Sequence, residues 1–258
     1  MNRNDDFANF CKKAVIENHN RYNIGTYSEK RLHTVLKNYI CDDLNYHEVV
    51  VSDTGLDHKK TSNYIADILI GDKIYEIQTG SFYPLVPKIN YYMQNTDYYV
   101  EIVYPIMLNK KVFWINKEDG EIKKPKMSPI HGSYEQLLAE MYHLLPFINN
   151  SKISFHVLLL GGSEYKTYDN IKNNKKRNPA RYEIIPTELY EERIFKDKND
   201  FIEIVPKELS QSFFAKDFAK ATGLRGRAVY GALIVLCELG IILKGDKIGR
   251  SFEYRKNY

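Results

Sequence analysis

The residues with the clearest chemical potential are Asp67, Glu76 and Gln78, which lie on either side of the dipeptide Gly71–Asp72. A Gly-X dipeptide between two isoleucine-rich runs suits a two-residue type II′ hairpin turn. Pairing the residues next to this turn and counting outwards places Asp67 opposite Glu76. Because side chains alternate between the faces of a strand, Gln78 lies on the same face as both acids.

The two opposed carboxylates limit what this hairpin can be. Opposed Cβ atoms lie about 4.5–5.5 Å apart, so Asp67 and Glu76 repel each other. Their isoleucine and leucine neighbours predict little contact with water. An acidic pair of this kind has to share a proton, meet a cation or bind a metal ion. We interpret it as a metal site; the alternative is an ordinary hairpin with polar residues on a solvated face.

The pattern of Asp67 followed by Glu76-Ile77-Gln78 resembles the D…ExK core of the PD-(D/E)xK, restriction-endonuclease-like nucleases. The resemblance covers about residues 26–106, and glutamine stands where the family carries lysine. It implies that Asp67 and Glu76 hold Mg²⁺ or Mn²⁺ through carboxylate oxygens. It also implies a catalytic role for Gln78, whose amide would orient the attacking water without adding a charge.

The elements that must position these residues follow the order that the resemblance implies. Helical spacing predicts an amphipathic helix that opens on a capping residue, and β-rich runs predict the strands. This order predicts an α/β fold with a restriction-endonuclease-like mixed sheet flanked by helices. The expected elements are a helix over 26–40, a strand over 47–52, the hairpin over 64–79, a helix over 85–94 and a strand over 98–106.

Two charged residues outside the motif are further candidates. Glu29 lies one turn into the first of these helices, and the resemblance implies a catalytic role as a third carboxylate. The alternative is a favourable interaction of Glu29 with the helix dipole. Lys88, in the helix after the hairpin, could replace the missing motif lysine, but from the sequence we favour a solvated surface lysine.

The chain after residue 106 predicts the rest of a first domain over residues 1–168. A hairpin is expected over 111–124 with its turn at Asp119–Gly120, followed by a helix over 133–147 and a strand over 153–160. His156 in that strand is expected to be a satisfied structural histidine. Residues 169–204 are expected to form a basic connector that contacts phosphates or is simply solvated. Its candidate nucleic-acid-binding residues are Lys175, Lys176, Arg177 and Arg181.

The C-terminal stretch predicts a second domain over residues 205–258. A helix over 214–222 closed by Gly223, a turn, and a helix over 228–239 precede a two-stranded wing with its turn at Gly245–Asp246. This order resembles a winged helix-turn-helix over about residues 205–256, which implies duplex-DNA binding, although such domains also bind proteins. The basic residues that the resemblance places near DNA are Arg225, Arg227, Lys244, Lys247 and Arg250.

Composition narrows the classes of function. A hydrophobic share of 43% is ample for a core, and a net charge of +4 permits a polyanionic partner. The three cysteines lack metal-ligand spacing, which predicts reduced thiols in a cytoplasmic protein. The first residues lack an apolar stretch, so no signal peptide is expected. The sequence has no run of about 18 apolar residues, and no nucleotide-binding or nucleophile-elbow motif. No membrane association and no small-molecule enzyme are therefore expected.

These observations together predict a cytoplasmic, Mg²⁺- or Mn²⁺-dependent deoxyribonuclease with a winged-helix domain that binds double-stranded DNA. The prediction leaves a homodimer open. Two alternatives remain: a catalytically inactive nuclease-fold factor that binds DNA, and a factor that mediates protein contacts.

Overall fold

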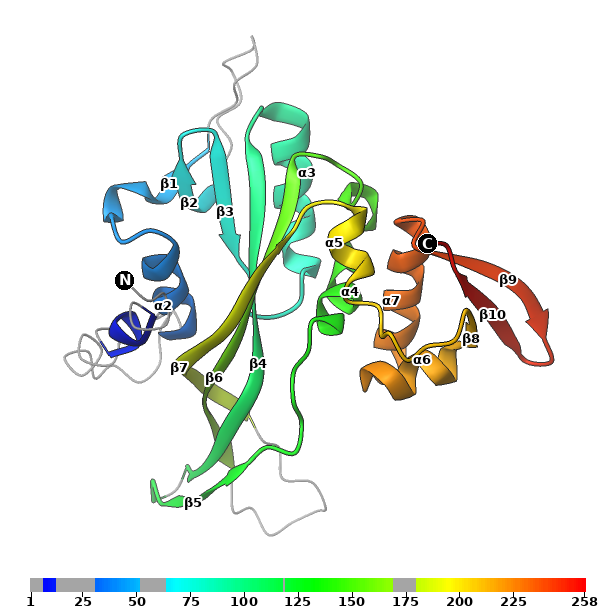
Figure 1. Cartoon of the computed structure of the whole chain (residues 1–258). Coiled ribbons are helices and arrows are strands. Elements are labelled where there is room, and N and C mark those ends of the chain that lie inside the picture. The colour runs from blue at the N-terminus through cyan, green and yellow to red at the C-terminus, as the bar shows by residue number, and fades with distance from the viewer. Residues whose placement is uncertain (1–6, 13–30, 52–63, 118, 169–179) are drawn as a thin grey trace. The chain divides into compact units, whose positions relative to one another are not determined.

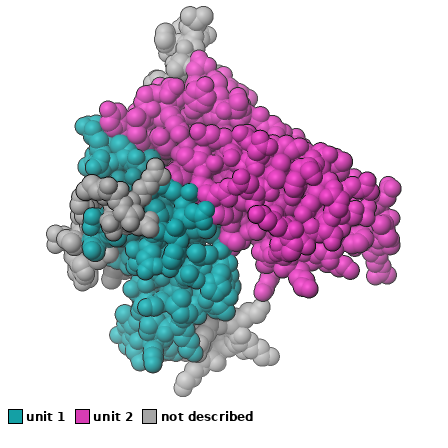
Figure 2. Space-filling view, in the orientation of Figure 1, with its two compact units in different colours: residues 1–45, 105–132, 158–192 teal, residues 46–104, 133–157, 193–258 magenta. Residues whose placement is uncertain are grey.

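The computed structural model of the chain describes residues 7–12, 31–51, 64–117, 119–168 and 180–258, with only the backbone described for 180–182. The chain divides into two compact units (Figure 2). The first comprises residues 1–45, 105–132 and 158–192, and the second residues 46–104, 133–157 and 193–258.

A large mixed β-sheet flanked by helices organises the chain, in agreement with the expected α/β class (Figure 1). Its strand order is β1-β2-β3-β4-β6-β7, and β5 pairs with β4 outside this path. The pairs β1–β2, β2–β3 and β4–β5 are antiparallel, whereas β3–β4 is parallel. The strands are β1 (His47–Val50), β2 (Ile65–Ile70), β3 (Lys73–Ile77), β4 (Tyr99–Asn116), β5 (Ile122–Met127), β6 (Ile153–Tyr168) and β7 (Ala180–Phe195).

The parallel pairing of β3 with β4 requires a crossover, which α3 (Val86–Asn95) supplies in the second unit. The short 3₁₀ turn η2 (Tyr83–Leu85) precedes it. Pro87 lies in the first helical turn, where a missing N–H costs nothing. Ile89 and Tyr92, three positions apart, are fully buried. Their burial turns this stripe of α3 towards the apolar interior, and Lys88 lies beside it.

In the first unit, α2 (Arg31–Ile40) is the described part of the helix expected over 26–40. Leu32, Val35 and Leu36 form its buried stripe at helical spacing. The β4–β5 hairpin agrees with the expected hairpin over 111–124, and Gly120 at its turn has a φ of 74°.

The remaining helices of the second unit are α4 (Glu135–Met141), the 3₁₀ helix η3 (Tyr142–Phe147), α5 (Lys198–Ile202), α6 (Ala215–Thr222) and α7 (Arg227–Glu238). Helix α7 packs against α4 and η3. The approach is close, since a Cβ atom on Gly231 would lie 3.4 Å from Cβ of Tyr142. A second, three-stranded sheet follows the order β8-β10-β9, with β8 (Ser212–Phe214), β9 (Ile242–Ile248) and β10 (Ser251–Lys256).

Three long strands differ from the sequence-based expectation. The strand expected over 98–106 and the first arm of the next hairpin are one strand, β4, and β6 continues to Tyr168. Strand β7 and helix α5 lie where a basic connector over 169–204 was expected. The reason is long-range pairing: polar, charged sequence becomes a strand when a neighbouring strand continues alongside it.

The turn of the C-terminal hairpin is also displaced from its predicted position. Strand β9 runs through Gly245–Asp246, and the tip is Gly249–Arg250, where Gly249 has a φ of 62°. The register shifts between Phe252 and Tyr254, so Gly245–Asp246 opposes the single residue Glu253. The dipeptide that looked like a turn is therefore a β-bulge.

Candidate functional site

The β2–β3 hairpin brings Asp67 and Glu76 together. Ile70 pairs with Lys73 across the turn, as expected, and Gly71 has the positive φ of 59° that such a turn needs. The observed register ends at the pair Ile68 and Tyr75. One further step along the strands places Asp67 opposite Glu76.

Glu76 is the most buried acid of this site, at 1% exposure. Its Oε2 lies 2.6 Å from Nζ of Lys88, and its Oε1 accepts a hydrogen bond of 2.9 Å from the Tyr92 hydroxyl. Burial, together with the neighbouring charge of Asp67, raises the pKa of Glu76 to about 7 against the opposing effect of Lys88 and Tyr92. Glu76 therefore titrates near neutral pH.

Asp67 is only partly buried and is held by the backbone of the adjacent strand. Its Oδ2 accepts a hydrogen bond of 2.7 Å from the N–H of Ile77. This bond fixes the Asp67 carboxylate at the strand that carries Glu76, so the two acids share one site.

Gln78 is hydrogen-bonded through both its backbone and its side chain. Its backbone N–H donates to the carbonyl of Val103 at 2.9 Å, and its side-chain amide donates to the carbonyl of Ser81. This contact ties Gln78 to the segment that leads into α3. One of the two amide N–H groups that could orient a water is therefore already bonded to the backbone.

Our sequence interpretation of Lys88 as a solvated surface lysine is wrong. Its side chain is 19% exposed and its ammonium group contacts Glu76. A signal was present in the sequence: Lys88 and Tyr92 are spaced i, i+4 on one helix, so both reach the same neighbour.

The other predicted site residues divide into two sets. Residues Glu29, Lys175, Lys176 and Arg177 lie outside the described residues, as does the side chain of Arg181. The C-terminal set is described and exposed: Arg225 and Arg227 around the start of α7, Lys244 and Lys247 on β9, and Arg250 at the hairpin tip.

Helix α7 is buried along more than one side. Its packing against α4 and η3 adds to its contacts with α6 and β9. Its exposed positions are Arg227, Tyr230, Ile234 and Glu238, of which only the first is basic. The hairpin of β9 and β10 is thus the more basic exposed element, and the ammonium of Lys244 lies 3.8 Å from the ring centroid of Phe252.

The acid pair fits a divalent cation in donor type. Mg²⁺ is commonly held by one or two carboxylates, with waters and substrate phosphates completing its coordination. Asp67 and Glu76 supply two such groups from adjacent strands. Among the described residues, no group of three or more His, Cys, Asp or Glu side chains gathers as a larger ligand set.

The described chain is thus a mixed α/β protein with an acidic pair and a lysine on one sheet face. It belongs to the family described as "Domain of unknown function (DUF8091)", which matches residues 30–196. A protein of Treponema pallidum (strain Nichols), titled "Uncharacterized protein", is 25% identical over 235 residues, which cover 90% of this chain and 87% of that protein. No solved structure matches the chain significantly. No helix among the described residues has the length and apolar character to cross a membrane.

Proposed function

We propose that the protein is a metal-dependent DNA nuclease of the PD-(D/E)xK type, with a C-terminal winged-helix domain that binds double-stranded DNA. The observation that carries the proposal is the contact of 2.6 Å between the ammonium of Lys88 and the carboxylate of Glu76, opposite Asp67. Two acids and a lysine in one site are the groups that phosphodiester hydrolysis uses in the resembled family.

The order of the elements supports the same proposal. Helix α2 precedes three antiparallel strands, α3 crosses over, and β4 pairs parallel with β3. This is the order that the resemblance implied from the sequence. It places both acids on the central hairpin and the lysine on the crossover helix.

The chain's own residues divide the work as follows. Asp67 and Glu76 would hold Mg²⁺ or Mn²⁺, which when bound polarises the scissile phosphate and acidifies a water. Tyr92 fixes one oxygen of Glu76 by its hydrogen bond. Lys88 favours the ionised form of Glu76 and presents a positive charge to the phosphate, the role of the motif lysine in the resembled family.

The raised pKa of Glu76 couples metal binding to protons. A carboxylate with a pKa of about 7 is partly protonated at neutral pH. A cation binds the ionised form, so binding releases a proton and tightens as the pH rises through 7.

The test is cleavage of supercoiled plasmid and linear DNA by the full chain with Mg²⁺, with Mn²⁺ and with EDTA. We expect cleavage with either metal, none with EDTA, and none from the Asp67→Ala variant. Lys12→Glu, a change on an exposed lysine outside the residues proposed to bind metal or DNA, is the control. Wild-type protein that leaves both substrates intact with both metals would overturn the proposal.

One observation favours a second candidate, a catalytically inactive factor that keeps the fold. Both oxygens of Glu76 already have hydrogen-bonding partners, and the residue is 1% exposed. In this case the wild-type protein binds DNA but does not cleave it. DNA retention in EDTA at rising salt separates a DNA-binding factor from a protein-binding one, because phosphate contacts weaken steeply with salt.

A further inference from the structure

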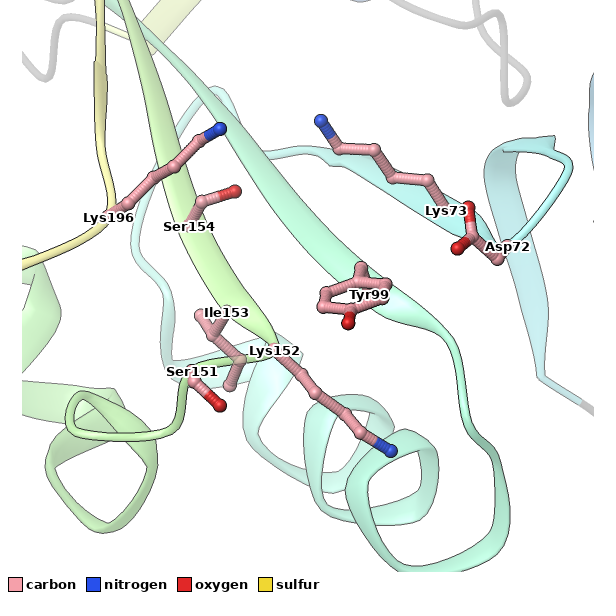
Figure 3. A pocket seen from close by; sticks show the side chains of 8 residues that line it. All are labelled: Asp72, Lys73, Tyr99, Ser151, Lys152, Ile153, Ser154 and Lys196. Atoms are coloured by element: carbon pink, nitrogen blue, oxygen red, sulfur yellow. The ribbon is translucent and has the colours of Figure 1, made fainter.

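A pocket lies in the second unit, where β3, β4 and β6 begin (Figure 3). Its volume is about 240 Å³. Its lining includes Lys73 from β3, Tyr99 from β4, Ser154 from β6 and Lys196 from the segment after β7. Nothing in the proposed hydrolysis uses these residues.

The pocket belongs to the sheet face opposite Glu76. Side chains alternate along β3, so Lys73 and Tyr75 point away from the face that carries Glu76. In the parallel pair β3–β4, Tyr75 is aligned with Glu101. The two faces of one strand therefore carry two separate polar sites.

The buried carboxylate of Glu101 holds two residues of the pocket lining, Lys73 and Ser154, in place. Glu101 is 2% exposed, and its Oε2 lies 2.6 Å from Nζ of Lys73 and accepts a hydrogen bond of 3.3 Å from the Ser154 hydroxyl. Its Oε1 lies 3.1 Å from Nδ1 of His156. Buried ion pairs add little net stability, so holding Lys73 in place is a better account of this arrangement.

Two lysine side chains of the pocket, Lys73 and Lys196, are placed where they could bind an anion. In Figure 3 the ammonium groups of Lys73 and Lys196 point towards each other above the Ser154 hydroxyl. Lysine has three donor hydrogens, and Glu101 takes only part of those of Lys73. Lys152, also in the lining, is instead paired with Asp97 at 3.0 Å. Glu101 offsets part of the charge of Lys73, so the positive charge that the cavity offers to an anion comes mainly from Lys196.

Two further residues of the lining, Tyr99 and Asp72, have side chains that could contact the base and the sugar of a nucleotide whose phosphate lies near the lysines. Tyr99 is 48% exposed and offers an aromatic face at the mouth of the pocket. Asp72, at the hairpin turn, offers a carboxylate of the kind that accepts hydrogen bonds from sugar hydroxyls. Exposed aromatic rings stack bases without regard to sequence.

We propose that this pocket binds a nucleotide, with its phosphate between Lys73 and Lys196 and its base against Tyr99. The nucleotide is either free or the 5′-phosphorylated end of a DNA strand, since both present the same phosphate monoester. The site is independent of hydrolysis at Glu76, because it lies on the other face of the sheet.

The test is isothermal titration of the full chain in EDTA, where no metal-dependent cleavage occurs. The ligands are AMP, a short 5′-phosphorylated oligonucleotide and the same oligonucleotide with a 5′-hydroxyl. We expect saturable binding of a phosphorylated ligand that Lys196→Glu weakens by about 10-fold or more, the cost of one charged hydrogen bond. The matched charge reversal Lys12→Glu, on an exposed lysine outside the proposed DNA-binding domain, should leave the Kd within about 2-fold.

The ligands also identify the source of the phosphate. Tighter binding of the 5′-phosphorylated oligonucleotide than of AMP and of the 5′-hydroxyl form assigns the pocket to strand ends. AMP bound as tightly or more tightly assigns it to free nucleotides. Absence of binding to both phosphorylated ligands would overturn the inference, as would equal weakening by Lys196→Glu and Lys12→Glu.

Discussion

Two buried glutamates, Glu76 and Glu101, lie on neighbouring strands of one sheet and behave in opposite ways. Each is at most 2% exposed and each contacts a lysine ammonium at 2.6 Å. Burial raises the pKa of Glu76 to about 7. Burial acts in the same direction on Glu101, but hydrogen bonds and charge from His156 and Lys73 hold its pKa at about 2.

The difference lies in the other partners of each carboxylate. Glu101 has two donors besides its lysine and no acid among the causes of its shift. Glu76 has the Tyr92 hydroxyl and a like charge, Asp67. A salt bridge alone therefore does not fix the charge of a buried acid. Glu76, whose pKa is raised towards neutral pH, is suited to exchange its bound cation. Glu101, whose pKa is lowered, stays ionised and is suited to hold a lysine in place.

The largest effect is expected at Glu76. Glu76→Ala removes a metal ligand, so metal-dependent cleavage should fall by about 1000-fold or more, equivalent to several kcal/mol of lost charge stabilisation. Metal affinity, followed by titration calorimetry, should fall as well. Cleavage by Glu76→Ala at the wild-type rate would show that the chemistry lies elsewhere.

A large loss of stability is expected at Glu101, because Glu101→Gln leaves the buried His156 and the partly buried Lys73 without their anion. The free energy of unfolding at pH 7 should fall by about 3 kcal/mol, measured by guanidinium denaturation. A loss within experimental error would mean that the pair contributes nothing.

The pH dependence of stability should have opposite signs at the two acids. The folded-state pKa of Glu101 lies below its ordinary value of 4.5, so its contribution is complete above pH 4.5 and is lost as the pH falls towards 2. The folded-state pKa of Glu76 lies above 4.5, so its contribution is complete below pH 4.5 and is lost as the pH rises through 7. As the pH rises from 4.5 to 7, the free energy of unfolding of Glu76→Gln should therefore increase relative to that of the wild type. The difference between Glu101→Gln and the wild type should change little over the same range. Equal slopes for both variants would contradict the comparison.

Local rules explain which parts of this arrangement the sequence could predict. The Gly71–Asp72 turn and the period-two alternation determine the hairpin register, and with it the pairing of Asp67 and Glu76. The rotation of α3 is set by burial of Ile89 and Tyr92 in a core that the sequence does not display. For that reason the role of Lys88 became visible only in the folded chain.

Long-range pairing explains the rest of the differences. Gly245–Asp246 has the composition of a turn, yet the partner strand β10 makes it a bulge and leaves the tip at Gly249–Arg250. His156 was expected to be a satisfied structural histidine, and its contact with Glu101 confirms this. Glu101 itself gave no sequence signal, because its partners come from strands far apart in the chain.

A moderate effect is expected at Lys88, the cation of the proposed active site. Lys88→Ala should slow cleavage by about 100-fold, the range for losing one positioned donor in a transition state. Lys73→Ala, the matching change on the other sheet face, should leave the cleavage rate of the folded protein close to wild type. Equal losses from the two changes would indicate a common effect on folding, which thermal melting would reveal.

The smallest effect is expected at Gln78, although it occupies the position of the family's motif lysine. Its amide donates to the carbonyl of Ser81, so removing it costs one neutral hydrogen bond and no contact with Glu76. Gln78→Ala should therefore slow cleavage by about 10-fold or less, well below the loss in Lys88→Ala. The double variant Gln78→Lys with Lys88→Ala tests the exchange directly, because a lysine at 78 would restore the motif charge from the strand. Recovery of most of the activity lost in Lys88→Ala would show that the charge, and not its position on α3, is what the site needs. A Gln78→Ala loss as large as that of Lys88→Ala would instead assign the water-orienting role to the glutamine.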